Sequence, residues 1–333
     1  MDPVTQGVFG SLWAQAGSRG KQLRRVGAAG FVAGMAPDLD VLIRSQDDAL
    51  LFIDYHRHFT HAIPFAPIGG LLVALALWPL LRRELRFTVL YLACFLGYVS
   101  HGLLDAFTSY GTHLGWPFTE SRVALSWISV IDPLFTLPLL VLLGLGLWRR
   151  RRAFALAALV WAAFYLGLGA WQQQRAEQAL LTWMQHNNVV SERYIAKPSF
   201  ANLLLWRGLI DEGSHFRALA IRQPLWGAPR IYEGARVAVL ASDSLLPSGS
   251  RAARDVGRFT IFSDGWVFRY APREQAGYWF IGDFRYAMDP ASERPLWGIH
   301  LDPTQPDAGV RFERLREVDR RERERFMQRL RGE

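Results

Sequence analysis

Four long apolar stretches dominate the first half of the chain. They cover residues 63–81, 87–104, 133–148 and 153–171, and none contains an Asp, Glu, Lys or Arg. A helix needs roughly 17–25 apolar residues to cross a bilayer, and the four stretches reach or approach that length. A soluble core of this size has no room to bury four such helices. The pattern therefore predicts an integral membrane protein with four spans.

Two shorter apolar segments, at residues 4–16 and 26–36, precede these stretches. The basic residues between them are Arg19, Lys21, Arg24 and Arg25. The shorter segment would cover only about 17 Å as a helix, so it cannot span a bilayer by itself. Glycines at positions 7, 10, 27, 30 and 34 permit close helix contact in a membrane. We expect a short helical hairpin that dips into the bilayer from the outer face. Amphipathic helices lying on the surface are the alternative.

The pattern changes after residue 175, although residues 177–188 fit an outward continuation of the last helix. Short alternating runs separated by Gly, Pro and Asp follow at 215–222, 236–241, 259–270, 278–287 and 296–301. Such runs predict strands, and the stretch 311–331 predicts a highly charged amphipathic helix. The predicted fold class is an α-helical integral membrane domain over residues 1–175, with four spans plus a short N-terminal helical hairpin. A small β-rich extramembrane domain over residues 190–333 follows it and ends in the charged helix.

The distribution of charge gives the predicted spans an orientation. The chain carries a formal net charge of +8, with arginine clusters at 82–86 and 149–152, between consecutive apolar stretches. A chain that crosses four times puts both loops on one side, which the positive-inside rule assigns to the cytoplasm. The connection 105–132 and everything after residue 171 would then lie on the non-cytoplasmic side of a bacterial inner membrane.

Other global features narrow the class of protein. No zinc finger, RNP signature or basic heptad accompanies the positive charge, so the expected partner is the lipid bilayer and no nucleic acid is expected. The single cysteine, Cys94, excludes an intrachain disulfide. The N-terminus lacks the basic leader of a cleaved signal peptide.

Three groups of potential metal ligands lie at the predicted outer ends of apolar segments. They are Asp38 with Asp40, then His56, His58 and His61, and finally His101 with Asp105. Imidazole and carboxylate are the usual ligands of zinc, manganese and non-haem iron. An ionisable group in an apolar segment is costly unless it is paired or coordinated. Three segments distant in sequence thus bring such groups to one region, and we predict a divalent metal site there.

Each group also has a structural interpretation. His101 could be a core histidine bonded to Asp105, which lies four residues later on the same helix face. Asp38 and Asp40 could terminate a helix. His56 and His58 alternate and would point to opposite sides of an extended segment, so we favour His56 and His61 as ligands.

Weaker candidates and missing motifs limit the choice further. His113 and Asp132 lie on the predicted outer side, but a solvated loop histidine and a span-starting turn explain them as well. His186, His215 and His300 show no partner spacing and are expected to be structural. The chain contains no HExxH, Walker A loop or G-x-S-x-G elbow.

These residues resemble the YdjM family of bacterial inner-membrane proteins, which are described as metal-dependent hydrolases. The resemblance covers about residues 1–140. It is carried by MDPVTQ at 1–6, PDLD at 37–40, HRHFTH at 56–61, SHGLLD at 100–105, and YGT with WPF within 110–118. That family is distantly similar to the zinc-dependent phospholipase C and S1/P1 nuclease group of helical enzymes.

The resemblance implies a ligand set around a divalent metal, zinc or else manganese or iron. The implied ligands are Asp40, one of His56 or His61, His101 and Asp105. Two residues depart from the family's pattern. Gln6 stands where many members have His, which bears on any further metal, and His58 replaces a small residue, usually Gly.

The leading hypothesis is a membrane-bound metal-dependent hydrolase. The metal would lower the pKa of a water molecule. Asp38 would act as general base or as a partner of a ligand, and Arg57 would hold a phosphate or carboxylate. A site at the outer membrane–water interface favours a phosphoester or lipid-linked substrate. The alternatives are a non-enzymatic membrane protein with a structural metal site and a partner-binding β-rich domain, and a transporter.

Overall fold

The computed structural model describes residues 1–18, 22–240, 246–273, 277–315 and 320–333. This described chain divides into two compact units. The first comprises Met1–Ile43, Tyr55–Trp171 and Phe200–Asn202, and the second comprises Arg44–Asp54, Gln172–Ser199 and Leu203–Glu333. The segment Arg44–Asp54 therefore interrupts the sequence of the first unit while belonging to the second.

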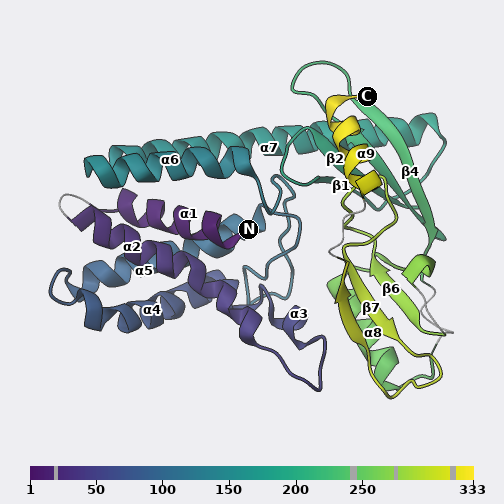
Figure 1. Ribbon diagram of the computed structural model, residues 1–333, viewed down its shortest axis with the longest axis horizontal. Helices are drawn as coiled ribbons and strands as arrows, with labels where there is room; N and C mark the ends of the chain where they lie inside the picture. The colour runs from purple at the N-terminus through teal and green to yellow at the C-terminus, as the bar shows by residue number, and fades with distance from the viewer. Residues whose placement is uncertain (19–21, 241–245, 274–276, 316–319) are drawn as a thin grey trace. The chain divides into compact units, whose positions relative to one another are not determined.

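The first unit is built from α-helices, and four of them lie side by side (Figure 1). These are α1 (Pro3–Ala16), α2 (Leu23–Met35), α4 (Ala66–Leu81) and α5 (Phe87–Ala106). The helices α6 (Pro133–Arg149) and α7 (Ala153–His186) follow in the chain. The short connecting elements are η2 (Ala36–Leu42), η3 (Phe59–His61) and η4 (Ile63–Phe65). The short helix α3 (Leu51–Tyr55) lies, except for its last residue, in the segment of the second unit.

Among the described residues, three helical stretches are long and apolar enough to cross a membrane: Ile63–Leu81, Phe87–Ala106 and Ala153–His186. They correspond to three of the four predicted spans as candidate membrane-spanning helices, and α7 includes the predicted continuation of the last one. The fourth, predicted at 133–148, forms the apolar but shorter helix α6 of 17 residues. The predicted N-terminal hairpin corresponds to α1 and α2. Arg19 and Lys21, between those helices, lie outside the described residues.

Two aspartates set the starts of helices in the first unit. The Asp2 carboxylate accepts a hydrogen bond from the Thr5 amide at 3.0 Å and caps α1. Asp132 caps α6 in the same way, through the Phe135 amide at 3.3 Å, and also accepts from the Tyr165 hydroxyl at 2.9 Å. A capping side chain satisfies backbone donors that have no partner within the helix. Asp132 thus caps α6 and links it to α7 through Tyr165. These contacts give a structural explanation for Asp132, which was a weaker site candidate.

Glycines allow two segments to lie directly against α5. A Cβ added at Gly97 would overlap the carbonyl oxygen of Gly30 on α2, and one added at Gly102 would overlap the carbonyl oxygen of His61 in η3. Small residues permit this close backbone approach between helices in a membrane protein. His101 lies one turn after Gly97 and next to Gly102. The two glycines therefore bring α2 and η3 to the part of α5 that carries His101.

The described part of the second unit contains two four-stranded antiparallel sheets. The first sheet runs β1 (Tyr194–Pro198), β2 (Leu205–Asp211), β3 (His215–Arg222) and β4 (Arg230–Ala238). The second runs β5 (Val267–Arg269), β6 (Trp279–Asp283), β7 (Trp297–Leu301) and β8 (Arg311–Arg314). The helices are α8 (Arg251–Phe262), the short η5 (Ala271–Arg273) and α9 (Arg320–Arg331). Phe216, Trp266 and Phe284 belong to its buried core.

The β-rich domain is confirmed, but two of its predicted segments are wrong. Residues 259–270, predicted as one strand, contain the end of α8 and the short strand β5. Ser250 caps α8 through the Ala253 amide at 3.2 Å, and Ala252, Phe259 and Phe262 are buried at helical spacing. The predicted helix 311–331 instead begins with β8, which pairs with β7, and only α9 is helical.

The strand predicted at 215–222 is confirmed as β3, and the remaining strand predictions differ in their boundaries. The strand predicted at 236–241 is β4, which begins six residues earlier and ends at Ala238. Ala241 lies outside the described residues. The strand β2, with six buried residues in a row, shows no alternation and was missed. A strand covered on both faces loses the period-two pattern on which such predictions depend.

We predict that Gly97→Ala destabilises the protein by about 1–3 kcal/mol, because the added methyl group forces α2 away from α5. Thermal unfolding in detergent would measure the loss. Gly144→Ala on α6 is the matched control, since no described atom lies within 4 Å of its added Cβ. An equal loss in the two variants would contradict the close contact at Gly97.

Candidate metal centre

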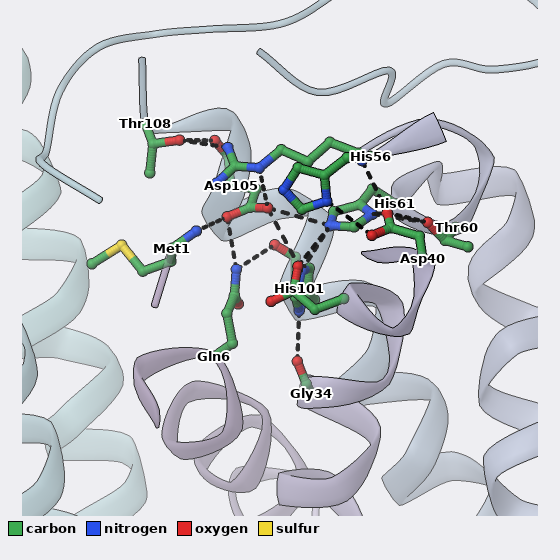
Figure 2. Close-up of polar contacts among 12 residues, drawn as sticks. Met1, Gln6, Gly34, Asp40, His56, Thr60, His61, His101, Asp105 and Thr108 are labelled. Atoms are coloured by element: carbon green, nitrogen blue, oxygen red, sulfur yellow. Dashed lines mark hydrogen bonds and ion pairs between the residues drawn. The ribbon is translucent and has the colours of Figure 1, made fainter. Parts of the chain in front are cut away.

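The three predicted groups of ligands come together in the first unit, as Figure 2 shows. Asp38 and Asp40 come from η2, His61 comes from η3, and His101 and Asp105 come from the C-terminal part of α5. Asp40, His61, His101 and Asp105 are almost completely buried. The side chain of Asp38 is 22% exposed and marks the accessible side of the group.

Four side-chain atoms surround one point. The Nε2 atoms of His61 and His101 lie 2.9 Å apart, and Asp38 Oδ1 lies 3.5 Å from each of them. Asp105 Oδ2 lies 3.4 Å from His61 Nε2 and 3.6 Å from His101 Nε2. A tetrahedral zinc ion with bonds of about 2.0–2.1 Å separates its ligand atoms by roughly 3.3–3.4 Å. The spacing of the four atoms therefore fits one tetrahedral metal ion.

Hydrogen bonds at the opposite ring nitrogens orient both histidines. His101 Nδ1 donates to the carbonyl oxygen of Gly34 at 2.6 Å. The Thr60 hydroxyl donates to Asp40 Oδ2 at 3.0 Å, so its oxygen accepts from His61 Nδ1, also at 3.0 Å. A neutral imidazole that carries its proton on Nδ1 has a lone pair on Nε2.

The two Nε2 lone pairs thus face each other and two carboxylate oxygens. Asp105 Oδ2 is buried and makes no hydrogen bond within the described chain. Converging acceptors repel one another unless a cation or an added proton lies between them. Carbonyl and hydroxyl acceptors behind metal-bound histidines are the usual arrangement in metal sites, because they fix the ring and its tautomer. The chemistry of this donor set fits a divalent metal ion.

Asp40, predicted as a ligand, has both oxygens engaged by other donors. Oδ1 accepts from His56 Nδ1 at 2.8 Å, and Oδ2 accepts from the Arg57 amide and the Thr60 hydroxyl, each at 3.0 Å. Burial raises the pKa of Asp40, but the hydrogen bond from His56 and that from the Arg57 amide hold it below its ordinary value. The ionised carboxylate therefore orients His56 and the Thr60–His61 pair from behind the four-atom group.

His56, the other predicted ligand from the same run, also lies outside the four-atom group. It forms a second group of possible ligands with Asp38 and Asp40, whose ligand atoms lie within 4.8 Å of one another. Burial lowers the pKa of His56, although the Asp40 carboxylate opposes this. A neutral His56 that donates from Nδ1 to Asp40 keeps a basic Nε2.

Arg57 is buried and directed at Asp105. Its Nε lies 3.1 Å from Asp105 Oδ2, its Nη1 donates to Thr108 Oγ1 at 2.9 Å, and its guanidinium stacks over the Tyr110 ring at 4.8 Å. The other Asp105 oxygen accepts from Gln6 Nε2 at 2.8 Å and contacts the amino nitrogen of Met1. These neighbours surround Asp105, whose Oδ2 lies toward the histidines. The guanidinium of Arg57 contacts Asp105, Thr108 and Tyr110, and its phosphate- or carboxylate-binding role stays a prediction.

Another set of possible ligands is His58, His113 and Glu120. Arg122 Nε donates to His113 Nε2 at 3.2 Å, so this nitrogen is occupied by a cation's proton. Burial, together with Arg122 and His58, lowers the pKa of His113 to about 4. Glu120 is largely exposed. A metal ion that binds His113 Nε2 would have to displace the Arg122 guanidinium. This set therefore does not offer the free acceptor atoms of the four-atom group.

The histidines of the second unit, expected to be structural, each have a hydrogen-bond partner. His186 Nδ1 bonds to the Thr182 carbonyl at 2.7 Å, and His300 Nε2 bonds to Glu313 at 2.5 Å. His215 Nδ1 bonds to the neighbouring Ser214 hydroxyl at 2.9 Å.

Two residues of the centre were missed as functional from the sequence. Thr60 and Gly34 act through hydrogen bonds to Nδ1 atoms. Thr60 could have been identified from the sequence, because it directly precedes His61. The contribution of Gly34 is a backbone oxygen, which no residue type reveals.

Comparison with known proteins finds relatives of the helical part. The model of the YdjM inner membrane protein family matches residues 1–176. The uncharacterized protein YfhP of Bacillus subtilis (strain 168) is 31% identical over 130 residues, which are 39% of this chain and 39% of YfhP. The inner membrane protein YbcI of Escherichia coli (strain K12) is 30% identical over 146 residues, covering 37% of this chain and 83% of YbcI. The match to YfhP thus covers well under two thirds of that protein. No solved structure matches the chain.

We predict that Thr60→Val lowers the affinity for zinc by about 10–100-fold, because His61 Nδ1 loses an acceptor that orients the ring. Competition with a fluorescent zinc chelator would measure the affinity. Thr60→Ser keeps the hydroxyl and should bind zinc as the wild type does. Identical affinities of the Val and Ser variants would show that the hydroxyl does not orient His61.

Proposed function

The chain belongs to the YdjM inner membrane protein family, and on this basis we propose that it is a membrane-bound metal-dependent hydrolase. One observation carries the proposal: four acceptor atoms converge while both histidine Nδ1 atoms are already used as donors. The residues that would hold the ion are Asp38, His61, His101 and Asp105. Two nitrogens and two oxygens suit zinc, with manganese and iron as alternatives. When bound, such an ion supplies a Lewis acid that activates water or polarises an ester oxygen.

The neighbouring residues have distinct roles in this proposal. Asp38 belongs to the four-atom group and so acts as a ligand, which leaves His56 as the general base. His56 Nε2 accepts a proton from water while Asp40 holds the ring through Nδ1. Arg57 keeps Asp105 ionised and oriented.

The surface beside Asp38 supports a lipid-linked phosphoester as the substrate. In η2, Leu39 is 63% exposed and Leu42 is 73% exposed, and Met35 just before η2 is also exposed. Apolar side chains next to the accessible ligand of a polar site suit an amphiphilic molecule, whose chain stays in the bilayer while its headgroup reaches the ion. Hydrolysis would add water across the phosphoester bond and give a phosphate and an alcohol.

The arrangement of basic loops supports a location for the centre. We propose that α6 is the fourth span, beside the three longer helical stretches. The loops with Arg82, Arg83 and Arg86 and with residues 149–152 would then face the cytoplasm. The metal centre and the chain after the apolar part of α7 would lie on the non-cytoplasmic side.

We predict that purified wild-type protein contains about one divalent ion per chain and hydrolyses a phosphoester at its metal centre. His101→Ala should lose both the ion and the activity. His56→Ala should keep the ion and lose about 10²–10⁴-fold in kcat, the usual effect of removing a general base. Elemental analysis and initial rates would measure the two quantities. A long-chain phospholipid and a short-chain soluble ester with the same headgroup would serve as substrates.

The outcomes separate the functions. Faster hydrolysis of the long-chain ester supports the lipid-linked substrate, and a preference for the soluble ester contradicts it. Stoichiometric metal without hydrolysis of either ester would overturn the enzyme and leave a structural metal site. Loss of metal in His56→Ala would make His56 a ligand.

The proposed orientation predicts which loops can be labelled from outside. In a Cys94→Ala background, Ser121→Cys between α5 and α6 should react with a membrane-impermeant maleimide in intact spheroplasts. Arg83→Cys, between α4 and α5, should react only after the membrane is opened. Labelling in the reverse order would invert the proposed topology.

A further inference from the structure

The segment Arg44–Asp54 is built into the second unit. Leu50 and Ile53 in this segment are fully buried. The Phe52 ring packs edge-on against Phe312 of β8, with centroids 4.9 Å apart, and Arg314 stacks over it at 5.7 Å. Buried apolar side chains and an aromatic contact hold a segment far more firmly than a surface loop is held.

Arg258 of α8 holds the same segment through its charges. Its Nη1 and Nη2 donate to the two Asp48 oxygens at 3.0 and 2.9 Å, and its Nε donates to Asp54 at 3.0 Å. Asp255, on the same helix, accepts from Nη1 at 3.2 Å. A planar guanidinium that binds one carboxylate through two nitrogens and a second through the third is specific in geometry as well as in charge.

The ends of this segment lead directly into the metal centre. Asp40 lies four residues before Arg44, and His56 and Arg57 lie two and three residues after Asp54. Asp40 receives the hydrogen bonds of His56 and of the Arg57 amide. The chain thus leaves the centre at Asp40, is fixed within the second unit, and returns to the centre at His56.

We infer that Arg258 is a positioning residue for the metal centre and acts through the segment Arg44–Asp54. The second unit fixes the path of the chain between Asp40 and His56, and so sets the geometry of the hydrogen bonds that orient His56 and His61. The effect of Arg258 on catalysis rests on the proposed function. The hydrogen bonds of Asp40 with His56 and the Arg57 amide are present without a metal ion. It also gives residues after Gln172 a role in a centre whose ligands all precede them.

The test compares full-length Arg258→Gln with wild type and with Arg217→Gln. Arg217 on β3 pairs with Glu212 at 2.5 Å and stacks over the Trp183 ring, and both partners lie outside the segment, so it is the matched control. In Arg258→Gln, hydrogen exchange of the peptide 55–61 should become about tenfold faster, because the Arg57 amide no longer keeps its acceptor. Peptides of α2 and α5 should be unchanged. Zinc affinity should fall about tenfold, and the visible spectrum of the cobalt-substituted protein should shift, in this variant alone.

The outcomes distinguish this inference from the proposed function. Unchanged exchange at 55–61 in Arg258→Gln, or an equal change in Arg217→Gln, would overturn the positioning role. If the wild type binds no zinc, the metal proposal fails while the exchange measurement still decides the positioning. Should Arg258→Gln not fold, Asp48→Asn removes the bidentate contact from the other side and is measured in the same way.

Discussion

The centre of this protein depends on the compensation of buried acceptor groups at one end of an apolar helical bundle. His61, His101 and Asp105 place two imidazole nitrogens and a carboxylate oxygen in a region with almost no access to water, and Asp38 adds a second carboxylate at its edge. Uncompensated, such groups would cost several kcal/mol each. The hydrogen bonds of Gly34 and Thr60 lie at the opposite ring nitrogens, and Arg57 Nε lies 3.1 Å from Asp105 Oδ2, so we propose a cation among the four atoms as the partner of the two Nε2 lone pairs. This requirement explains why the neighbouring donors are arranged as they are.

The apolar scaffold makes that concentration of charge possible. Gly30 and Gly97 let α2 and α5 approach until the Gly34 carbonyl reaches His101, and Gly102 lets η3 approach until His61 faces the same ring. Helices separated by ordinary side chains would leave the two imidazoles apart. The glycines that allow the helices to pack closely therefore also determine the distance between the two imidazoles.

The second unit bears on the centre through the chain itself. Arg44–Asp54 has its buried residues and its ion pairs within that unit, whereas the residues on either side of it orient the ligands. YbcI is matched over 83% of its length by 37% of this chain. In the present chain, we infer that Arg258 of the β-rich second unit affects the orientation of His56 through this segment.

The sequence by itself determined the membrane helices, the β-rich second part and the region where Asp and His residues gather. These depend on apolar length, on alternation and on the order of segments, which are local properties of a chain. The alternation of polar and apolar residues did not reveal β2, because six of its residues in a row are buried. It also gave a wrong strand at 259–270, where a capping serine and apolar residues at helical spacing form the end of α8. Tertiary structure alone decided that Asp38 and His61 join the four-atom group while Asp40 and His56 lie behind it. The direction of a side chain in a short 3₁₀ segment depends on which donors surround it, and those donors come from residues far away in the chain.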